Sequence, residues 1–276
     1  MKDYTKLLPE HIEKFIGEQD LFVEIYESQS TMPGTTKAPP LLFVHGAYTG
    51  SWMWSKYIPH FLKDGWKCIA MNLRSHYKSR SMDLTRTTFE DYLADIKEII
   101  AQCGEAPILI GFSLGGTLSQ KIAETERLAG LVLIDSSLCK EVNELEPYES
   151  PVEFPFDLIV PAPAREERVS PDESEEDIAF QKKYLSMESS LAFRSSACWA
   201  KGIEGISVNS ALVTCPVLVI RAVNSESDDR RGKAEAAYYR GEYTGLQGTT
   251  HTGLLVGQRY LEAVDRILAW LKHVKA

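Results

Sequence analysis

The chain has 276 residues, of which 44% are hydrophobic and 25% charged, and its formal net charge is −9. These values are typical of a folded globular protein and argue against a disordered or fibrous chain. An acidic chain without a block of clustered Lys and Arg is a poor match for nucleic acid. No apolar run reaches the roughly 18 residues of a membrane span, and the charged first residues lack the apolar core of a signal peptide. We therefore expect a cytoplasmic protein without a membrane span or a nucleic-acid partner.

The five cysteines are an odd number, scattered through the chain without C-x-x-C spacing. No Cys/His pair has the spacing of zinc ligands. We expect reduced, structural cysteines, no metal and no cofactor, and the sequence assigns no oligomeric state.

Short apolar runs alternate with amphipathic stretches along the chain, which is typical of a mostly parallel sheet connected by crossover helices. Several runs are continuous in Val, Ile and Leu, as buried parallel strands require. The predicted strands are an N-terminal hairpin at 14–16 and 21–26, followed by 40–45, 67–72, 107–111, 131–135, 216–221 and 242–246.

Three stretches have helical patterns. Residues 89–101 place apolar side chains at helical spacing, with acidic residues on the other face. Residues 117–125 follow a glycine-rich turn, and the C-terminal stretch from Tyr260 to Leu271 carries an apolar stripe that ends in lysines. We expect these helices to pack on the sheet and the last one to close the fold.

The interval 138–210 interrupts this alternation, being first acidic and Pro-rich and then helical in pattern around 178–199. Long insertions in compact domains usually serve a site, although a surface excursion without function is the alternative. We interpret 138–210 as an inserted cap between the two parts of one α/β core, residues 1–137 and 211–276.

The strongest chemical signal is the sequence GFSLGG around Ser113, between a predicted strand and a predicted helix. Glycines before and after the serine remove side chains that would collide in a sharp turn, which leaves the hydroxyl exposed. This context predicts that Ser113 is a nucleophile.

A second glycine turn, HGAY at 45–48, follows the strand at 40–45. An acyl-transfer enzyme needs backbone donors at such a position to stabilise a tetrahedral oxyanion. We expect the N–H groups of Ala47 and Leu114 to form this oxyanion hole, with His45 as a structural residue of the turn.

His251, in the late sequence GTTHTG, is the candidate base, because a serine hydroxyl needs a neutral imidazole to take its proton. His76 lies in a basic loop, and we expect it to be a solvated surface residue.

The ordered set HGA, GFSLGG and GTTH resembles the α/β-hydrolase superfamily over essentially the whole chain, particularly its cap-bearing esterases and lysophospholipase-like members. The resemblance implies an α/β-hydrolase fold, in which helices flank a mostly parallel sheet and a helical cap is inserted. The loop RSHYKS is similar to the family's R-G-H-G-x-S turn, with Ser75 and Tyr77 in place of both glycines.

The third member of such a site is a carboxylate that orients the histidine. The family usually places it after the seventh strand, but Ser225 stands there in this chain. Some members take the acid from the end of the sixth strand, where Asp135 lies, and Asp135 is our first choice. Asp228, or less well Glu226 or Asp229, is the alternative from a longer loop. Asp135 could instead be a strand-end cap, the charged run 228–231 could be a solvated loop, and a site without an acid is a third possibility.

We expect a serine hydrolase that cleaves a carboxylic ester or related acyl compound through an acyl-enzyme. Tyr48, Trp52, Phe112 and Trp199 are candidates to line a cleft for an apolar or aromatic acyl substrate. A non-hydrolytic enzyme of the same scaffold, such as a lyase or acyltransferase, and a ligand-binding pseudoenzyme are the alternatives.

Overall fold

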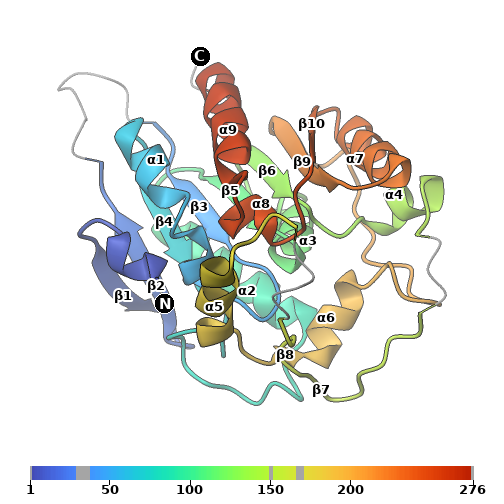
Figure 1. Cartoon of the computed structure of the whole chain (residues 1–276), viewed down its shortest axis with the longest axis horizontal. Coiled ribbons are helices and arrows are strands. Elements are labelled where there is room, and N and C mark those ends of the chain that lie inside the picture. The colour runs from blue at the N-terminus through green and yellow to red at the C-terminus, as the bar shows by residue number, and fades with distance from the viewer. Residues whose placement is uncertain (1, 29–37, 149–151, 166–170, 275–276) are drawn as a thin grey trace.

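The computed structural model describes residues 2–28, 38–148, 152–165 and 171–274. One sheet of eight strands forms its centre (Figure 1). In spatial order the strands are β1 (Ile12–Ile16), β2 (Leu21–Tyr26), β4 (Cys68–Met71), β3 (Leu41–Val44), β5 (Ile108–Phe112), β6 (Gly130–Ile134), β9 (Val217–Val223) and β10 (Glu242–Gln247).

The sheet is parallel from β4 to β10, and β2 pairs antiparallel with both of its neighbours, β1 and β4. All residues of β3, β4, β5 and β6 are buried, because helices cover both faces and leave no strand residue for solvent. The predicted α/β-hydrolase fold and its strands are confirmed, with boundaries shifted by a residue or two.

Alternate residues of the strands point to opposite faces of the sheet and contribute to two separate hydrophobic cores. Leu42 and Leu109 pack on one face with α2 (Phe89–Gln102), α3 (Leu114–Ile122) and α7 (Glu226–Tyr238). Phe43 and Ile110 pack on the other face with α1 (Ile58–Lys63) and α9 (Tyr260–Val274). Short helical turns complete the core: η1 (Tyr4–Leu7), η2 (Ser51–Trp54) and α8 (Gly253–Val256).

Between β6 and β9 the chain leaves the sheet, and we call residues 138–210 the insertion. Its elements are α4 (Lys140–Leu145), β7 (Ile159–Val160), α5 (Glu175–Tyr184), β8 (Glu188–Ser189) and α6 (Ser190–Ser196). The predicted helical stretch 178–199 is thus two helices separated by a short strand that pairs with β7. In Figure 1, α6, β7 and β8 lie in the lower part of the molecule, and α5 lies above them near the middle of the view.

The charged run at 228–231 is not a loop, as its composition suggested, but lies in the first two turns of α7. Ser225 is the N-cap of this helix, and its side chain accepts a hydrogen bond from the Asp228 backbone N–H. Within the described ranges, no helix is both long and apolar enough to cross a membrane.

Candidate active site

Ser113 occupies the turn between β5 and α3 with backbone angles φ 54° and ψ −122°. A positive φ is unfavourable for a residue with a Cβ, so neighbouring contacts must enforce this turn. The Ser113 N–H donates to the Ile134 carbonyl at 3.1 Å, and the Ser113 carbonyl accepts from the Thr117 N–H at 3.1 Å. The Ser113 side chain remains partly exposed and lines a cavity. This is the geometry of a nucleophile elbow.

The glycines around Ser113 are required by close backbone approaches. A Cβ on Gly115 would lie 2.3 Å from the His45 carbonyl oxygen, and one on Gly111 would lie 2.5 Å from the Gly115 oxygen. A Cβ on Gly46 would lie 3.0 Å from the Ser113 Cβ. The absence of side chains therefore allows the 45–48 turn to pack directly against the serine.

His251 and Asp135 are in direct contact, although 116 residues separate them. The distance from His251 Nδ1 to Asp135 Oδ2 is 2.6 Å, and the His251 side chain is about half exposed (48%) whereas that of Asp135 is 12% exposed. The His251 ring also stacks on Phe112, the residue before Ser113, with centroids 4.6 Å apart. The imidazole is thus held on two sides while one edge remains open.

Asp135 lies directly after β6, with φ 45°, and its Oδ1 accepts the Ala222 N–H at 3.2 Å. Burial works to raise the pKa of this carboxyl. The hydrogen bond and charge of His251, followed by the charge of Arg221, outweigh burial and hold the Asp135 pKa below its usual value. An ionised Asp135 accepts a hydrogen bond from the Nδ1–H of a neutral His251, which leaves Nε2 as the basic nitrogen.

Asp228 has different partners from those expected of an orienting acid. Its Oδ2 accepts the Asn224 N–H at 3.1 Å and the Ser225 hydroxyl at 2.9 Å, so the carboxylate serves the start of α7. Asp229 pairs with Lys233 and accepts the Tyr243 hydroxyl. The structure therefore brings Asp135, and not Asp228, to the histidine.

Of the two expected oxyanion donors, Leu114 follows Ser113 directly in the chain and Ala47 lies in the turn that packs against it. Leu114 is the first residue of α3, so its N–H has no acceptor within the helix. Ala47 lies in the turn that packs against Ser113, and it lines the same cavity as Ser113 and His251.

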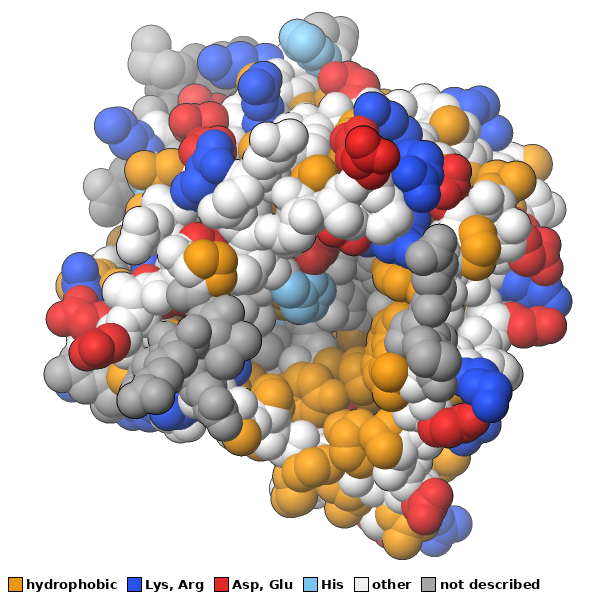
Figure 2. Space-filling view, turned by 45° about the vertical axis from the view of Figure 1, so that its right-hand side comes forward, with side chains coloured by type: hydrophobic (Ala, Val, Ile, Leu, Met, Phe, Trp, Pro, Cys, Tyr) orange, Lys and Arg blue, Asp and Glu red, His pale blue; other side chains and the backbone are white. Residues whose placement is uncertain are grey.

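One cavity of about 430 Å³ joins these groups, with Ser113, Asp135 and His251 in its wall. Its volume is in the range of pockets for small organic ligands. Figure 2 shows the hollow, with hydrophobic side chains on its floor and on one side. The aromatic side chains in its lining are Tyr48, Phe112, Tyr148, Phe193 and Trp199, and its cationic and amide groups are Arg165, Arg221 and Gln181.

Tyr48, Phe112 and Trp199 are therefore located at the cavity, as expected, but Trp52 is not. Its side chain is buried (1% exposed) and packs on Phe180 and Tyr184, with ring centroids 5.4 and 5.6 Å away. Trp52 joins η2 to α5 as part of the core, and the prediction that it contacts substrate is not supported.

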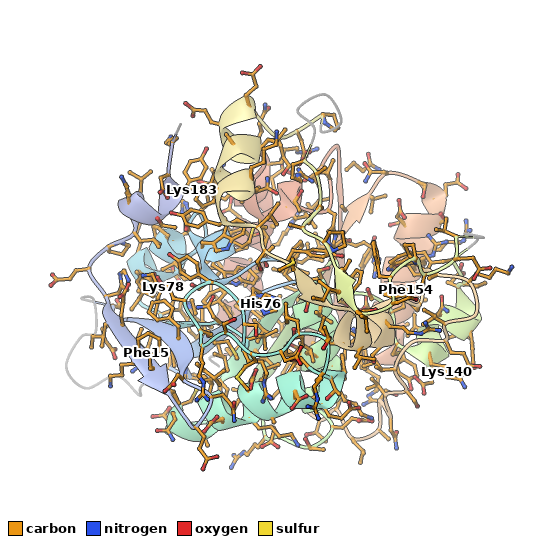
Figure 3. The ribbon with its side chains drawn as sticks, turned by 90° about the horizontal axis from the view of Figure 1, so that it is seen from below. Phe15, His76, Lys78, Lys140, Phe154 and Lys183 are labelled. Atoms are coloured by element: carbon orange, nitrogen blue, oxygen red, sulfur yellow. The ribbon has the colours of Figure 1, made fainter. Side chains whose placement is uncertain are left out.

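His76 was expected at the surface, and that prediction is wrong. Its side chain is fully buried, and its label lies near the middle of the molecule in Figure 3. Nδ1 contacts the Arg74 carbonyl at 2.9 Å, and Nε2 contacts Glu188 Oε2 at 3.0 Å. In the 74–79 loop, Ser75 and Tyr77 stand where the family has glycines. Both residues still adopt the positive φ that glycine favours, at 65° and 50°.

His45 has both ring nitrogens engaged, as expected of a structural residue. Nδ1 donates to the Gly46 carbonyl at 2.8 Å, and Nε2 accepts the Leu73 N–H at 3.1 Å. Burial lowers the pKa of His45 to about 3, so the ring stays neutral.

Among the described residues, one group has ligand atoms close enough to suggest a metal: His11, Glu13 and Glu24, within 4.8 Å of one another. These residues belong to the N-terminal hairpin region and do not line the cavity. The chemistry available at the cavity is that of a serine, a histidine and a carboxylate.

Residues 39–155 match the family model described as the alpha/beta hydrolase fold. Norfluorocurarine synthase 1 from Strychnos is 31% identical over 157 residues, which cover 52% of this chain and 57% of that protein. The match therefore spans little more than half of this relative.

Solved structures align over nearly the whole chain at low sequence identity. A thermophilic esterase from Thermogutta terrifontis is 18% identical with a TM-score of 0.64, covering 97% of this chain and 100% of that one. A monoacylglycerol lipase from Paleococcus ferrophilus is 18% identical with a TM-score of 0.65, covering 92% and 99%. Tomato methylketone synthase I is 16% identical with a TM-score of 0.64, covering 87% and 100%. These likenesses show a shared fold.

Proposed function

Because the chain belongs to the α/β-hydrolase superfamily, we propose that it is a serine hydrolase cleaving a carboxylic ester or related acyl compound. The observation that carries the proposal is the cavity whose wall contains Ser113, at a strained elbow, together with His251 in contact with an ionised Asp135. This combination supplies a nucleophile, a base and an orienting acid.

In the proposed reaction, His251 Nε2 takes the Ser113 hydroxyl proton as Oγ attacks the substrate carbonyl carbon. The carbonyl oxygen becomes an oxyanion bound by the N–H groups of Ala47 and Leu114. Collapse of the tetrahedral intermediate expels the alcohol, which takes the proton from His251, and leaves an acyl group on Ser113. His251 then deprotonates water, which attacks the acyl carbon and releases the carboxylic acid and free Ser113.

The acid of this mechanism is Asp135. The 2.6 Å contact to Nδ1 supports this role, and the lowered Asp135 pKa keeps the carboxylate able to stabilise an imidazolium. Asp228 is the weaker alternative, since its carboxylate serves the start of α7.

We propose that the substrate is a small molecule with an apolar or aromatic acyl group, bound against Tyr48, Phe112 and Trp199. Residues 138–210 act as the cap in this proposal, because Phe193 and Trp199 of the insertion complete the cavity wall. Apolar area buried there contributes to affinity at about 25 cal/mol per Å².

A non-hydrolytic reaction at the same site is the second candidate, and the name of the Strychnos relative, a synthase, favours keeping it. A lyase or an acyltransferase would use the same serine and histidine, but its main reaction would not be transfer of an acyl group to water.

The proposal is tested by comparing wild type with Ser113→Ala. Both proteins are assayed for hydrolysis of p-nitrophenyl esters of increasing acyl length and for labelling by a fluorophosphonate. We expect wild-type turnover and labelling that are both lost in Ser113→Ala. Labelling without turnover would favour the second candidate. Absence of both, or turnover that survives Ser113→Ala, would refute the proposed hydrolase.

A further inference from the structure

Glu188, in β8 of the insertion, is a fully buried carboxylate surrounded by donors. Its Oε2 lies 3.0 Å from His76 Nε2 and accepts the Tyr48 backbone N–H at 3.3 Å. Its Oε1 accepts the Tyr92 hydroxyl at 2.6 Å and the Ser189 N–H at 2.7 Å. A carboxylate can accept all four bonds, whereas an amide would turn its own N–H groups toward donors.

The charge of this carboxylate is balanced by His76. The Arg74 carbonyl can only accept at Nδ1, and a carboxylate accepts at Nε2, so both ring nitrogens carry protons and His76 is an imidazolium. Burial opposes the charge on both groups. Their mutual attraction and hydrogen bonds prevail, so that the pKa of His76 is raised and that of Glu188 is lowered. A buried ion pair of this kind has a defined geometry, because separating the partners would leave each charge buried without compensation.

This pair is attached to the turn that carries Ala47. Tyr48 has φ 67°, and both of its backbone polar groups are held by the insertion: its N–H by Glu188 and its carbonyl by the Ser186 N–H at 2.9 Å. On the other side of Ala47, the Gly46 carbonyl accepts the Thr49 hydroxyl at 2.8 Å. Since the peptide is planar and trans, fixing the Gly46 carbonyl also fixes the direction of the Ala47 N–H.

We infer that Glu188 is a positioning residue, through which the insertion holds the 45–48 turn in the conformation that directs the Ala47 N–H at the oxyanion. The inference rests on the proposed function, because it concerns the same site. It adds that the oxyanion hole is assembled jointly by the core and the insertion. Glu188 acts through the Tyr48 backbone and touches no reacting atom.

Replacing Glu188 with Gln should disturb the turn because the amide cannot satisfy the four donors. Loss of one oxyanion donor costs about 10²–10³ in rate, so partial misdirection of the Ala47 N–H should lower kcat by about 10- to 100-fold. Binding of the ground-state substrate, whose carbonyl carries no full charge, should change little, and KM should stay within about threefold.

The experiment compares wild type, Glu188→Gln and the matched control Glu153→Gln, whose carboxylate is exposed and pairs with Lys201. It measures kcat and KM on the best p-nitrophenyl ester, and inhibition by a trifluoromethyl ketone and by the carboxylic acid product. The ketone adds to the serine and forms an oxyanion, whereas the product does not. We expect ketone affinity to fall in proportion to kcat only in Glu188→Gln, and product affinity to stay within about threefold.

Tyr92→Phe separates positioning from stability, because it removes a donor to Oε1 and leaves the Tyr48 bond to Oε2. We expect it to lower the melting temperature but to keep kcat within about threefold. If Glu188→Gln does not fold, Glu188→Asp, which keeps the charge but shortens the side chain, should show the same selective loss in smaller measure.

An unchanged kcat in folded Glu188→Gln or Glu188→Asp would overturn the inference, as would equal losses of ketone and product affinity or an equal kcat loss in Tyr92→Phe. In each of these cases wild type remains an active, serine-dependent esterase. If wild type itself neither turns over esters nor reacts with the fluorophosphonate, the proposed function fails, and the inference fails with it.

Discussion

Replacing Asp135 with Asn changes the hydrogen-bonding character of a single atom beside His251. The Ala222 N–H donates to Oδ1, so an asparagine will keep its carbonyl oxygen at that position and turn its NH₂ toward His251 Nδ1. The His251 proton must then move to Nε2, where the base needs a lone pair. The backbone should tolerate the change, because asparagine accepts the positive φ of residue 135.

The wrong tautomer should lower kcat by about 10⁴, which corresponds to about 5.4 kcal/mol of transition-state stabilisation. The assay is steady-state hydrolysis of the best p-nitrophenyl ester, with circular dichroism to verify the fold and fluorophosphonate titration to count active sites. Substrate affinity should change little, since Asp135 acts through the histidine.

Asp228→Asn is the matched control. Its carboxylate bonds to Asn224 and Ser225 at the start of α7, so we expect at most about 1 kcal/mol of lost stability and kcat within about threefold of wild type. A folded Asp135→Asn variant that retains more than a tenth of wild-type kcat would refute the assignment, and so would equal losses in the two variants.

Three further outcomes are expected. Gly115→Ala should lose about 3 kcal/mol in urea unfolding, since its Cβ would lie 2.3 Å from a backbone oxygen; a loss below 1 kcal/mol would contradict this. Trp199→Ala should shift the ester series toward longer acyl chains, each newly buried CH₂ adding about 0.8 kcal/mol, or about fourfold in kcat/KM; an unchanged optimum would place Trp199 outside the acyl site. The His76–Glu188 pair should stabilise the fold most between pH 4.5 and 6.5. This contribution is lost as pH rises through the raised His76 pKa or falls through the lowered Glu188 pKa, so the unfolding free-energy difference between wild type and Glu188→Gln should peak in that window, and a flat difference would contradict the pairing.

The strands were predictable because burial on both faces leaves a continuous apolar run, as in β3 and β6. Helix α7 was missed because its first turns are charged and only a few of its residues are buried. The available signal was the pair Ser225 and Asp228, three residues apart. The serine accepts the Asp228 N–H, and the aspartate accepts the serine hydroxyl.

At the site, Ser113 and His251 could be proposed because their local contexts, a strand-to-helix glycine turn and a late loop, are visible in a short window. The competition between Asp135 and Asp228 could not be resolved there, because it depends on which strand end faces the histidine. His76 and Glu188 were beyond local reasoning. A basic loop and a short segment of the insertion give no sign that they form a buried ion pair across 112 residues.

The attachment of Tyr48 to Glu188 also has a consequence for folding order. The two residues are 140 positions apart, so the turn beside Ser113 cannot acquire its final hydrogen bonds until the insertion has been synthesised and has returned to the sheet. Contacts of such long sequence separation are costly to close and form late in folding. A nascent chain can therefore complete its central strands well before the turn at 45–48. If that turn serves the proposed reaction, reactivity toward a serine-directed probe should be among the last properties to appear during refolding.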